Sequence, residues 1–333
     1  MRILYIIGNG LDVALDMKTR YPDFYDYYCN LKVEERNEDV IKLRDDIEEN
    51  KEDWKDLESQ LGKYTGRVSK AEVMEGICLS LNDSLREYLL SEQAKVSSED
   101  FDRKLCILHM AFPEVYLLTT DREIVYQNTP DTSNRYIDII TLNYTDTLEK
   151  ILSNGKNGIA DSGPDTTGTR RWILGSLYHV HGTLSGSPLV GVDNASQIAN
   201  KEFAENEDLR EIMIKPEANS AIKSGVDRRC RELIAQANVI VLFGVSLGDT
   251  DLTWWKEIGK HLKDSNAIVI LFHYDPKMNL DHHEYYTAQY ERKWRGEFVR
   301  KSECGGAEKD WRKRIFVTFN RTFMDGVRKK EGK

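Results

Sequence analysis

Short apolar runs alternate with longer segments of helical periodicity along much of this chain. Residues 3–7 (ILYII) are continuously apolar, as expected for a strand covered on both faces of its sheet. Further strands are predicted at 137–143, 176–182, 188–194, 238–243 and 266–275, with an edge strand at 314–319. Helical segments follow several of these runs, which is typical of βαβ units with right-handed crossovers. The pattern therefore predicts a Rossmann-like, largely parallel α/β sheet.

The composition changes after the first strand, where helix formers and charged residues dominate. Apolar side chains recur there at three-, four- and seven-residue steps, the spacing of one helix face: Leu43, Ile47, Trp54, Leu57 and Leu61. The run at 97–100 (SSED) predicts the N-cap of a further helix. We therefore expect a single Rossmann-like domain over 1–333, with a mainly helical insertion at about 20–135. The Gly- and Thr-rich stretch at 154–169 has no hydrophobic period and is expected to be a mobile loop.

Charge and cysteine content narrow the class of protein. The 333 residues carry 47 Lys and Arg against 56 Asp and Glu, a formal net charge of −9, which disfavours nucleic acid as a partner. The sequence has no apolar run of about 18 residues that would span a membrane, and no cleavable signal pattern. Five scattered cysteines form no CxxC pair and indicate reduced thiols. We expect a cytoplasmic protein.

Small and polar residues follow five of the predicted strands. In open α/β sheets, ligands bind outside the carboxyl ends of the strands. The residues at these ends are Gly8, Asn9, Gly10 and Asp12; Asn143; His181 and Gly182; Asp193 and Asn194; and Gly244, Ser246, Gly248, Asp249 and Asp251. Because parallel strands end at one edge of their sheet, we expect these residues to gather around one ligand.

The Gly8-Asn9-Gly10 turn has two interpretations. Glycines let backbone N–H groups approach a diphosphate, and the N-terminus of the following helix favours negative charge. The third glycine of the dinucleotide fingerprint G-x-G-x-x-G is missing, since Val13 and Ala14 follow. The alternative is a turn in which glycine is needed for a positive φ.

His181 and Asn143 are the candidates for chemistry. An imidazole at a strand end beside a glycine is well placed to act as a general base, although a histidine hydrogen-bonded in the core would show the same local pattern. His179 faces the same side of the strand, so a metal pair is conceivable, but no third ligand of suitable spacing stands near and we expect no metal. The Asn143 amide suits the orientation of a water molecule or a ribose hydroxyl, or the N-cap of the next helix.

The segment Gly244-Val245-Ser246-Leu247-Gly248 matches the nucleophile elbow G-x-S-x-G. In a serine hydrolase of this kind, the acid and the histidine follow the serine along the chain. Four histidines do so here: His261, His273, His282 and His283. A hydrolase that uses Ser246 is therefore an alternative, although it leaves the first glycine turn and His181 without a role.

Taken in order, these motifs resemble the abortive-infection AbiH family of bacterial anti-phage proteins. The motifs are IIGNGLDVALDMKTRYPDF, DWKDLESQLGKY, TLNYTDTLEKI, YHVHGTL, LVGVDN and GVSLGDTD, and the resemblance covers essentially the whole chain. The family in turn resembles the sirtuin-type NAD-binding fold. This resemblance implies that the Gly8-Asn9-Gly10 turn holds dinucleotide phosphates, that Asn143 lies near the nicotinamide ribose and that His181 is a general base.

The resemblance reaches further residues, with departures. It implies that the Gly244-Val245-Ser246 turn approaches the cofactor and that Asp23 corresponds to a Pro-Asp-Phe motif, which lies nearer the glycine turn in sirtuins. Asp12, Asp193 and Asp249 are expected to bind the cofactor, the last two through ribose hydroxyls. Paired CxxC zinc motifs are missing, which disfavours protein deacetylation.

We therefore expect an anti-phage protein that binds NAD and, when triggered by a phage-derived signal, hydrolyses its nicotinamide–ribose bond. NAD is expected as substrate or ligand, without a metal and without a membrane, and a homo-oligomer is left open. The helical insertion would cover the site or sense the trigger. Two alternatives remain: a non-catalytic sensor of NAD or ADP-ribose, and a different hydrolase or nuclease that uses Ser246, Asp249 or Asp251.

Overall fold

The chain is built around one parallel sheet. The computed structural model describes residues 1–31, 38–129, 134–153, 171–276, 278 and 286–329. Six strands pair there in the order β3-β2-β1-β4-β5-β6, all parallel. They are β1 (Arg2–Ile7), β2 (Asn134–Thr141), β3 (Arg171–His179), β4 (Val239–Phe243), β5 (Ile268–His273) and β6 (Ile315–Phe319). The Rossmann-like parallel α/β prediction is confirmed, with the last strand at the edge.

The central strands are buried on both faces because their side chains are apolar at nearly every position. Ile3, Tyr5 and Ile7 of β1 join one core, and Leu4 and Ile6 join the other. All five are at most 1% exposed. Side chains alternate between the faces of a strand, so a continuous apolar run fills both cores.

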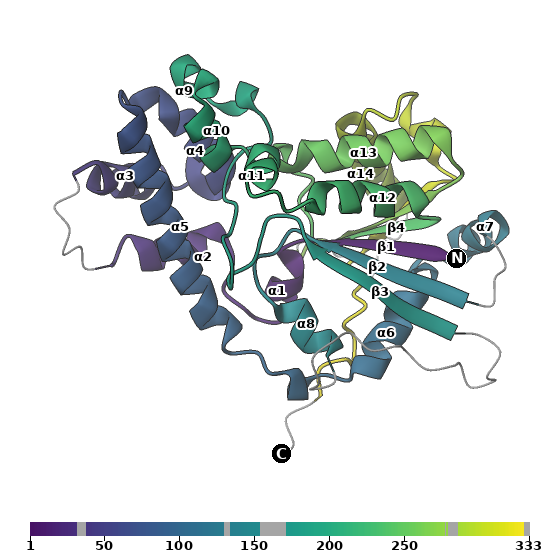
Figure 1. Ribbon diagram of the computed structural model, residues 1–333. Helices are drawn as coiled ribbons and strands as arrows, with labels where there is room; N and C mark the ends of the chain where they lie inside the picture. The colour runs from purple at the N-terminus through teal and green to yellow at the C-terminus, as the bar shows by residue number, and fades with distance from the viewer. Residues whose placement is uncertain (32–37, 130–133, 154–170, 277, 279–285, 330–333) are drawn as a thin grey trace.

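Helices cover both faces of the sheet (Figure 1). On the face of Leu4 and Ile6 lie α12 (Val226–Gln236), α13 (Leu252–Asp264) and α14 (Thr287–Ser302). On the opposite face lie α6 (Arg103–Ala111), α7 (Thr119–Asn128) and α8 (Thr147–Leu152). The result is the three-layer arrangement that a parallel sheet needs for burial on both sides.

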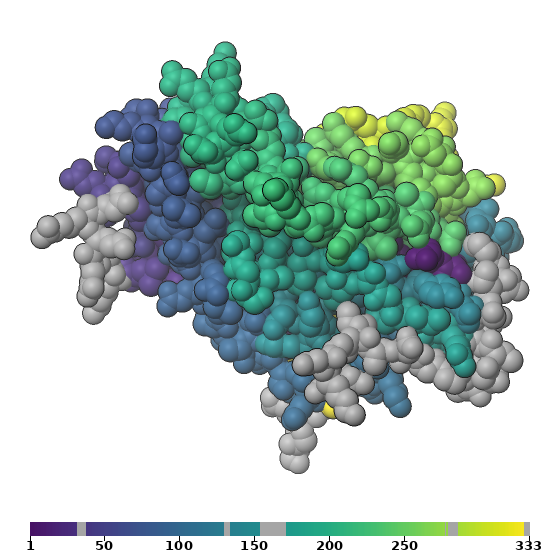
Figure 2. All heavy atoms as spheres, in the orientation of Figure 1, coloured from purple at the N-terminus to yellow at the C-terminus, as the bar shows by residue number. Residues whose placement is uncertain are grey.

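A further group of helices stands at the carboxyl ends of the strands (Figure 1). We call it the helical block: α2 (Tyr21–Tyr28), α3 (Glu38–Glu49), α4 (Leu57–Tyr64), α5 (Ala71–Gln93), α9 (Lys201–Glu205) and α10 (Glu207–Met213). Its core includes Phe24, Trp54 and Leu61. In the space-filling view, α5 and α10 lie side by side on this face of the molecule (Figure 2). The short helices α1 (Gly10–Ala14) and α11 (Lys215–Ala221) lie between the block and the sheet.

The helical stretch between β1 and β2 serves two purposes. Helices α2–α5 form the block, whereas α6 and α7 pack against the sheet. The apolar face expected over 43–61 is divided between α3 and α4, because Asp56 is extended and caps α4 by accepting from the Ser59 amide at 3.1 Å. The N-cap predicted at 97–100 forms a 3₁₀ turn, and α6 begins later, at Arg103. The predicted loop at 154–169 lies outside the described residues.

The strand predicted at 188–194 is wrong. Only Val192 pairs there, in an isolated parallel bridge with Ile214. Gly191 lies so close to the end of α10 that a Cβ would meet the Met213 carbonyl oxygen at 2.1 Å. The segment is therefore held against the helical block, and its alternating apolar residues fill that core instead of a sheet.

Candidate functional site

The exits of β1 and β4 lie side by side at the point where the strand order reverses. Chain order runs outward from β1 to β2 and β3 on one side, and through β4 to β5 and β6 on the other. In sheets of this order, ligands bind outside the carboxyl ends of the strands at that reversal. Residues 8–12 follow β1, and Gly244 follows β4 directly.

The glycines of the Gly8-Asn9-Gly10 turn allow close packing against the exit of β4. The Gly8 amide donates to the Phe243 carbonyl and the Gly10 amide to the Gly244 carbonyl, each at 2.9 Å. A Cβ on Gly10 would lie 2.4 Å from the Gly244 Cα. The positive φ belongs to Gly244, at 66°, and not to either glycine of the turn. We therefore explain these glycines by backbone approach, and their two N–H groups already have protein acceptors.

The side chains of Asn9 and Asp23 support the loop that follows this turn. Asn9 donates from Nδ2 to the Thr19 carbonyl at 2.8 Å and accepts from the Thr19 hydroxyl at 2.6 Å. Asp23 accepts from the Arg20 amide at 3.3 Å, at the start of α2. Both contacts fix the chain between α1 and the helical block.

Asp12 brings a buried carboxyl group to the exit of β1. It is 1% exposed, and its Oδ2 accepts a hydrogen bond from the Thr145 hydroxyl at 2.7 Å. Its Oδ1 is buried without a protein partner. Burial raises the pKa of Asp12 to about 6, even though the hydroxyls of Thr145 and Thr147 favour the charged form. A carboxyl group of this kind is a frequent feature of functional sites.

Asn143 and His181 are neighbours at the exits of β2 and β3. The strands pair Thr141 with His179, and the Val180 amide donates to the Thr141 carbonyl at 3.1 Å, so the pairing continues toward both residues. The Asn143 side chain is buried, and neither its Oδ1 nor its Nδ2 has a protein partner. We call Asp12, Asn143 and His181 the strand-exit site.

His181 is held by an acidic residue from beyond β4. Its Nε2 lies 2.7 Å from Oδ1 of Asp251, which belongs to the 3₁₀ turn Asp249–Asp251. Burial acts to raise the pKa of Asp251, but the charge of Lys215 and the hydrogen bonds from His181 and Lys215 outweigh burial and hold it well below its usual range. Asp251 is therefore ionised, and Nε2 of His181 must be the donor. The other ring nitrogen, Nδ1, is buried without a protein partner.

His179 does not form a metal pair with His181. Its Nδ1 lies 2.8 Å from the Asn143 carbonyl and its Nε2 lies 2.7 Å from Oε1 of Glu149. Burial lowers the pKa of His179, but the hydrogen bond and charge of Glu149 outweigh it, so that the pKa is raised. Both ring nitrogens serve as donors. Among the described residues, no group of three or more His, Cys, Asp and Glu side chains is arranged to hold a metal ion, and all five cysteines are free thiols.

Asp193 and Asp249 make contacts within the protein. The Asp193 carboxylate accepts from the amide and the hydroxyl of Thr253, each at 3.1 Å, at the start of α13. Asp249 forms an ion pair with Lys301, and its side chain is 65% exposed. Asp12, Asn143 and His181 thus follow the neighbouring strands β1, β2 and β3, whereas Asp193 and Asp249 have partners within the protein.

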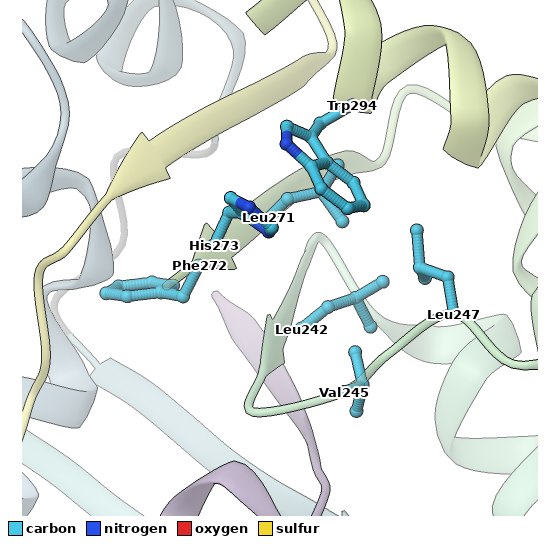
Figure 3. A pocket seen from close by; sticks show the side chains of 7 residues that line it. All are labelled: Leu242, Val245, Leu247, Leu271, Phe272, His273 and Trp294. Atoms are coloured by element: carbon cyan, nitrogen blue, oxygen red, sulfur yellow. The ribbon is translucent and has the colours of Figure 1, made fainter. Parts of the chain in front are cut away.

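The Ser246 turn lacks the geometry expected of a nucleophile elbow. Ser246 is exposed, and the positive φ of 54° falls on the next residue, Leu247. His261 bonds to the carbonyl of Ala237, which precedes β4, so it lies at the opposite end of that strand. His282 and His283 lie outside the described residues. The turn and β5 line a small, mostly apolar pocket with α14 (Figure 3): Leu242, Val245, Leu247, Leu271, Phe272, His273 and Trp294.

Two buried residues that sequence reasoning missed, Lys215 and Glu58, extend the site toward the helical block. Lys215, which is 3% exposed, donates from Nζ to Oδ1 of Asp251 and to Oε2 of Glu58, each at 2.9 Å. The Tyr144 hydroxyl donates to Oε1 of Glu58 at 3.2 Å. Glu58 lies in the DWKDLESQLGKY motif, which could have marked it, whereas Lys215 lies in none of the motifs.

Fold and site together define the class of protein. The parallel sheet, with its order reversal at β1 and β4, is that of Rossmann-like α/β proteins. The chain belongs to the AbiH family of bacteriophage abortive infection, whose profile matches residues 4–274. No curated protein matches the chain. None of the described helices has the length and apolarity of a membrane span. Family membership places the protein in abortive infection, a defence against phage.

Proposed function

We propose that this AbiH protein binds NAD at the strand exits and, when triggered, hydrolyses the bond between nicotinamide and ribose. The observation that carries the proposal is a set of buried polar atoms without protein partners: Oδ1 of Asp12, Oδ1 and Nδ2 of Asn143, and Nδ1 of His181. Each unpaired buried polar group costs about 1–3 kcal/mol. Four such atoms at neighbouring strand exits therefore favour a ligand with several hydroxyl groups, such as a ribose.

Each atom has a role that its chemistry permits. Oδ1 of Asp12 accepts from a ribose hydroxyl, and the Asn143 amide both accepts and donates, which orients the ribose or the attacking water. The diphosphate would extend past the Gly8-Asn9-Gly10 turn toward Gly244 and the exposed hydroxyl of Ser246. Because the amides of both turn glycines are already bonded, the phosphates need other donors. Asp23, Asp193 and Asp249 would take part only by exchanging their present contacts.

The reaction is a displacement at the anomeric carbon of the ribose. The carbon–nitrogen bond to nicotinamide breaks, its electron pair neutralises the pyridinium nitrogen, and a water oxygen bonds to the carbon. Nδ1 of His181 accepts the proton that the water loses and later passes it to solvent. The developing oxocarbenium charge is favoured by the carboxylate of Asp12, and positioning supplies much of the remaining effect.

The proposal is tested by nicotinamide release from NAD, measured by chromatography on protein purified from cells before and after phage infection. We expect His181→Ala and Asn143→Ala to reduce the rate by about 10²–10⁴-fold, the usual effect of losing a general acid–base group or its positioning partner. The matched control is His261→Ala, because this histidine lies at the opposite end of β4.

Turnover that survives both substitutions would overturn the assignment of roles. A thermal shift on adding NAD without nicotinamide release, in protein from infected cells, would instead identify a non-catalytic NAD sensor. If NAD causes no thermal shift and no nicotinamide is released, NAD is not the ligand.

A further inference from the structure

The charged residues around His181 form one buried chain that starts in the helical block. Glu58 belongs to α4 and is 6% exposed, Lys215 belongs to α11 and bridges it to Asp251, and Asp251 holds His181. The ion pairs of Lys215 join side chains whose exposure is 4%, 8% and 16%. Charged groups are buried to this extent only when they are paired. Removal of one of these side chains would therefore leave its partner buried without an opposite charge.

The direction of each proton in this chain follows from its charges. Burial lowers the pKa of Lys215, but Asp251 and Glu58 outweigh burial and raise it, so that Lys215 carries a charge. An ammonium group only donates, and an ionised carboxylate only accepts. Asp251 therefore accepts from both Lys215 and His181, which leaves the proton of a neutral His181 ring on Nε2. The unprotonated nitrogen is then Nδ1, which is buried without a protein partner.

Lys215 also weakens the attraction of Asp251 for a positive charge on the His181 ring. Lys215 and His181 contact the same oxygen, Oδ1 of Asp251, at 2.9 Å and 2.7 Å. A positive charge on the ring would therefore face the ammonium group of Lys215 across that oxygen. Besides Asp251, Glu58 and Asp227 of α12 also interact electrostatically with His181, and Asp227 accepts from Asn219 at 2.7 Å.

We propose that Asp251 and Lys215 are positioning residues for His181: Asp251 fixes the ring with Nε2 protonated, and Lys215, anchored by Glu58 of the helical block, keeps Nδ1 free to accept a proton. The inference rests on the proposed function for the use of that proton acceptor. The arrangement of protons itself does not depend on the ligand, so it can be tested without one.

The test is nitrogen-15 NMR of the full chain labelled at its seven histidines, with the His181 signals assigned from their loss in His181→Gln. In the wild type, we expect the neutral form of the ring to carry its hydrogen on Nε2. In Lys215→Met, Asp251 loses its cation and attracts a positive charge on the ring more strongly, so the doubly protonated fraction at a given pH should rise above that of the wild type. Lys215→Arg keeps the charge and should restore the wild-type fraction.

The matched control is Lys301→Met, because Lys301 is also buried and paired with an acid, Asp249, but does not contact His181. Its spectrum at His181 should equal that of the wild type. If Lys215→Met does not fold, the double variant Glu58→Gln with Lys215→Met removes one charge of each sign and should show the same rise in the doubly protonated fraction. Hydrogen on Nδ1 in the wild type, or an unchanged ring in the folded variants, would overturn the inference. These results are independent of NAD turnover, so the failure of one proposal does not decide the other.

Discussion

Asp12 illustrates at the scale of a single residue how the strand-exit site opposes folding. Its carboxyl group is buried and one of its oxygens has no protein partner. A solvated carboxyl group would not carry this free-energy cost. Buried and incompletely paired polar groups are expensive, and proteins retain them mainly where function requires them. The same atom that destabilises the free protein is therefore the one expected to meet a ligand.

The burial of Asp12 makes the free energy of unfolding depend on pH. Its pKa is about 6 in the folded protein against an ordinary value of 3.8, so between these values the folded state binds more protons than the unfolded state. The free energy of unfolding therefore falls as pH rises from about 4 to about 7. This difference in pKa corresponds to about 3 kcal/mol at pH 8.

We predict that Asp12→Asn stabilises the protein at pH 8 by up to about 3 kcal/mol and has no such effect near pH 4. The amide oxygen can still accept the hydrogen bond of Thr145 while the buried charge is lost. Urea unfolding at several pH values measures the difference. The control Asp26→Asn changes an exposed acid of α2 and should show no growing difference with pH. A constant difference across the range would contradict the assigned cause.

At the scale of elements, the first glycine turn is a contact between two strand exits. A Cβ on Gly10 would have to displace the Gly244 Cα and carbonyl, which lie 2.4 Å and 3.0 Å away and are backbone atoms. Neither element can yield without disturbing the pairing of β1 with β4. The turn is therefore required by the sheet whether or not a ligand binds.

We predict that Gly10→Ala destabilises the protein by about 1–3 kcal/mol, the usual effect of overpacking. The matched control is Gly76→Ala in α5, where an added Cβ would have no atom within 4 Å. That change should stabilise the helix by about 0.5–1 kcal/mol. Thermal or urea unfolding measures the stability of both variants. Equal effects of the two substitutions would show that the close approach of Gly10 to Gly244 is not the reason for the glycine.

The elements also show what sequence could and could not predict. The central strands were predictable because runs such as ILYII are apolar on both sides of the strand, so both faces must be buried in a core. Residues 188–194 have an equally apolar pattern, but Gly191 and Val192 pack against Met213 in a core that the local pattern does not encode. Asn143 and His181 were predictable as strand ends. Lys215 was not, because its partner Glu58 is 157 residues away.

At the scale of the whole molecule, the helical block and the sheet meet through the polar residues of the site. The block has its own apolar core, separate from the two cores of the sheet. Between them, Glu58 and Lys215 form a buried ion pair at 2.9 Å. Units with separate cores can open locally with different free energies. A ligand at the strand exits would therefore affect the block through the Glu58–Lys215–Asp251–His181 chain.

We predict that NAD slows hydrogen–deuterium exchange at the exits of β1, β2 and β3 and also in α4 and α11. These helices reach the exits through that chain, through the hydrogen bond from Tyr144 to Glu58 and through the hydrogen bond from Asn219 to the Val180 carbonyl. Ligand binding stabilises whatever the bound state keeps ordered. Helix α7, which packs against the sheet away from the exits, provides the internal reference and should not change.

The discriminating variant is Glu58→Gln, which removes the charge from the block side of the ion pair and leaves Asp251 and His181 untouched. With it, NAD should still protect the strand exits, while the protection of α4 should be lost because its link to Lys215 is weakened. Protection of α4 that persists in Glu58→Gln would show that the block responds through its packing. Protection confined to the exits in the wild type would show that the helical block does not sense the ligand at all, and would leave the trigger to act at another surface.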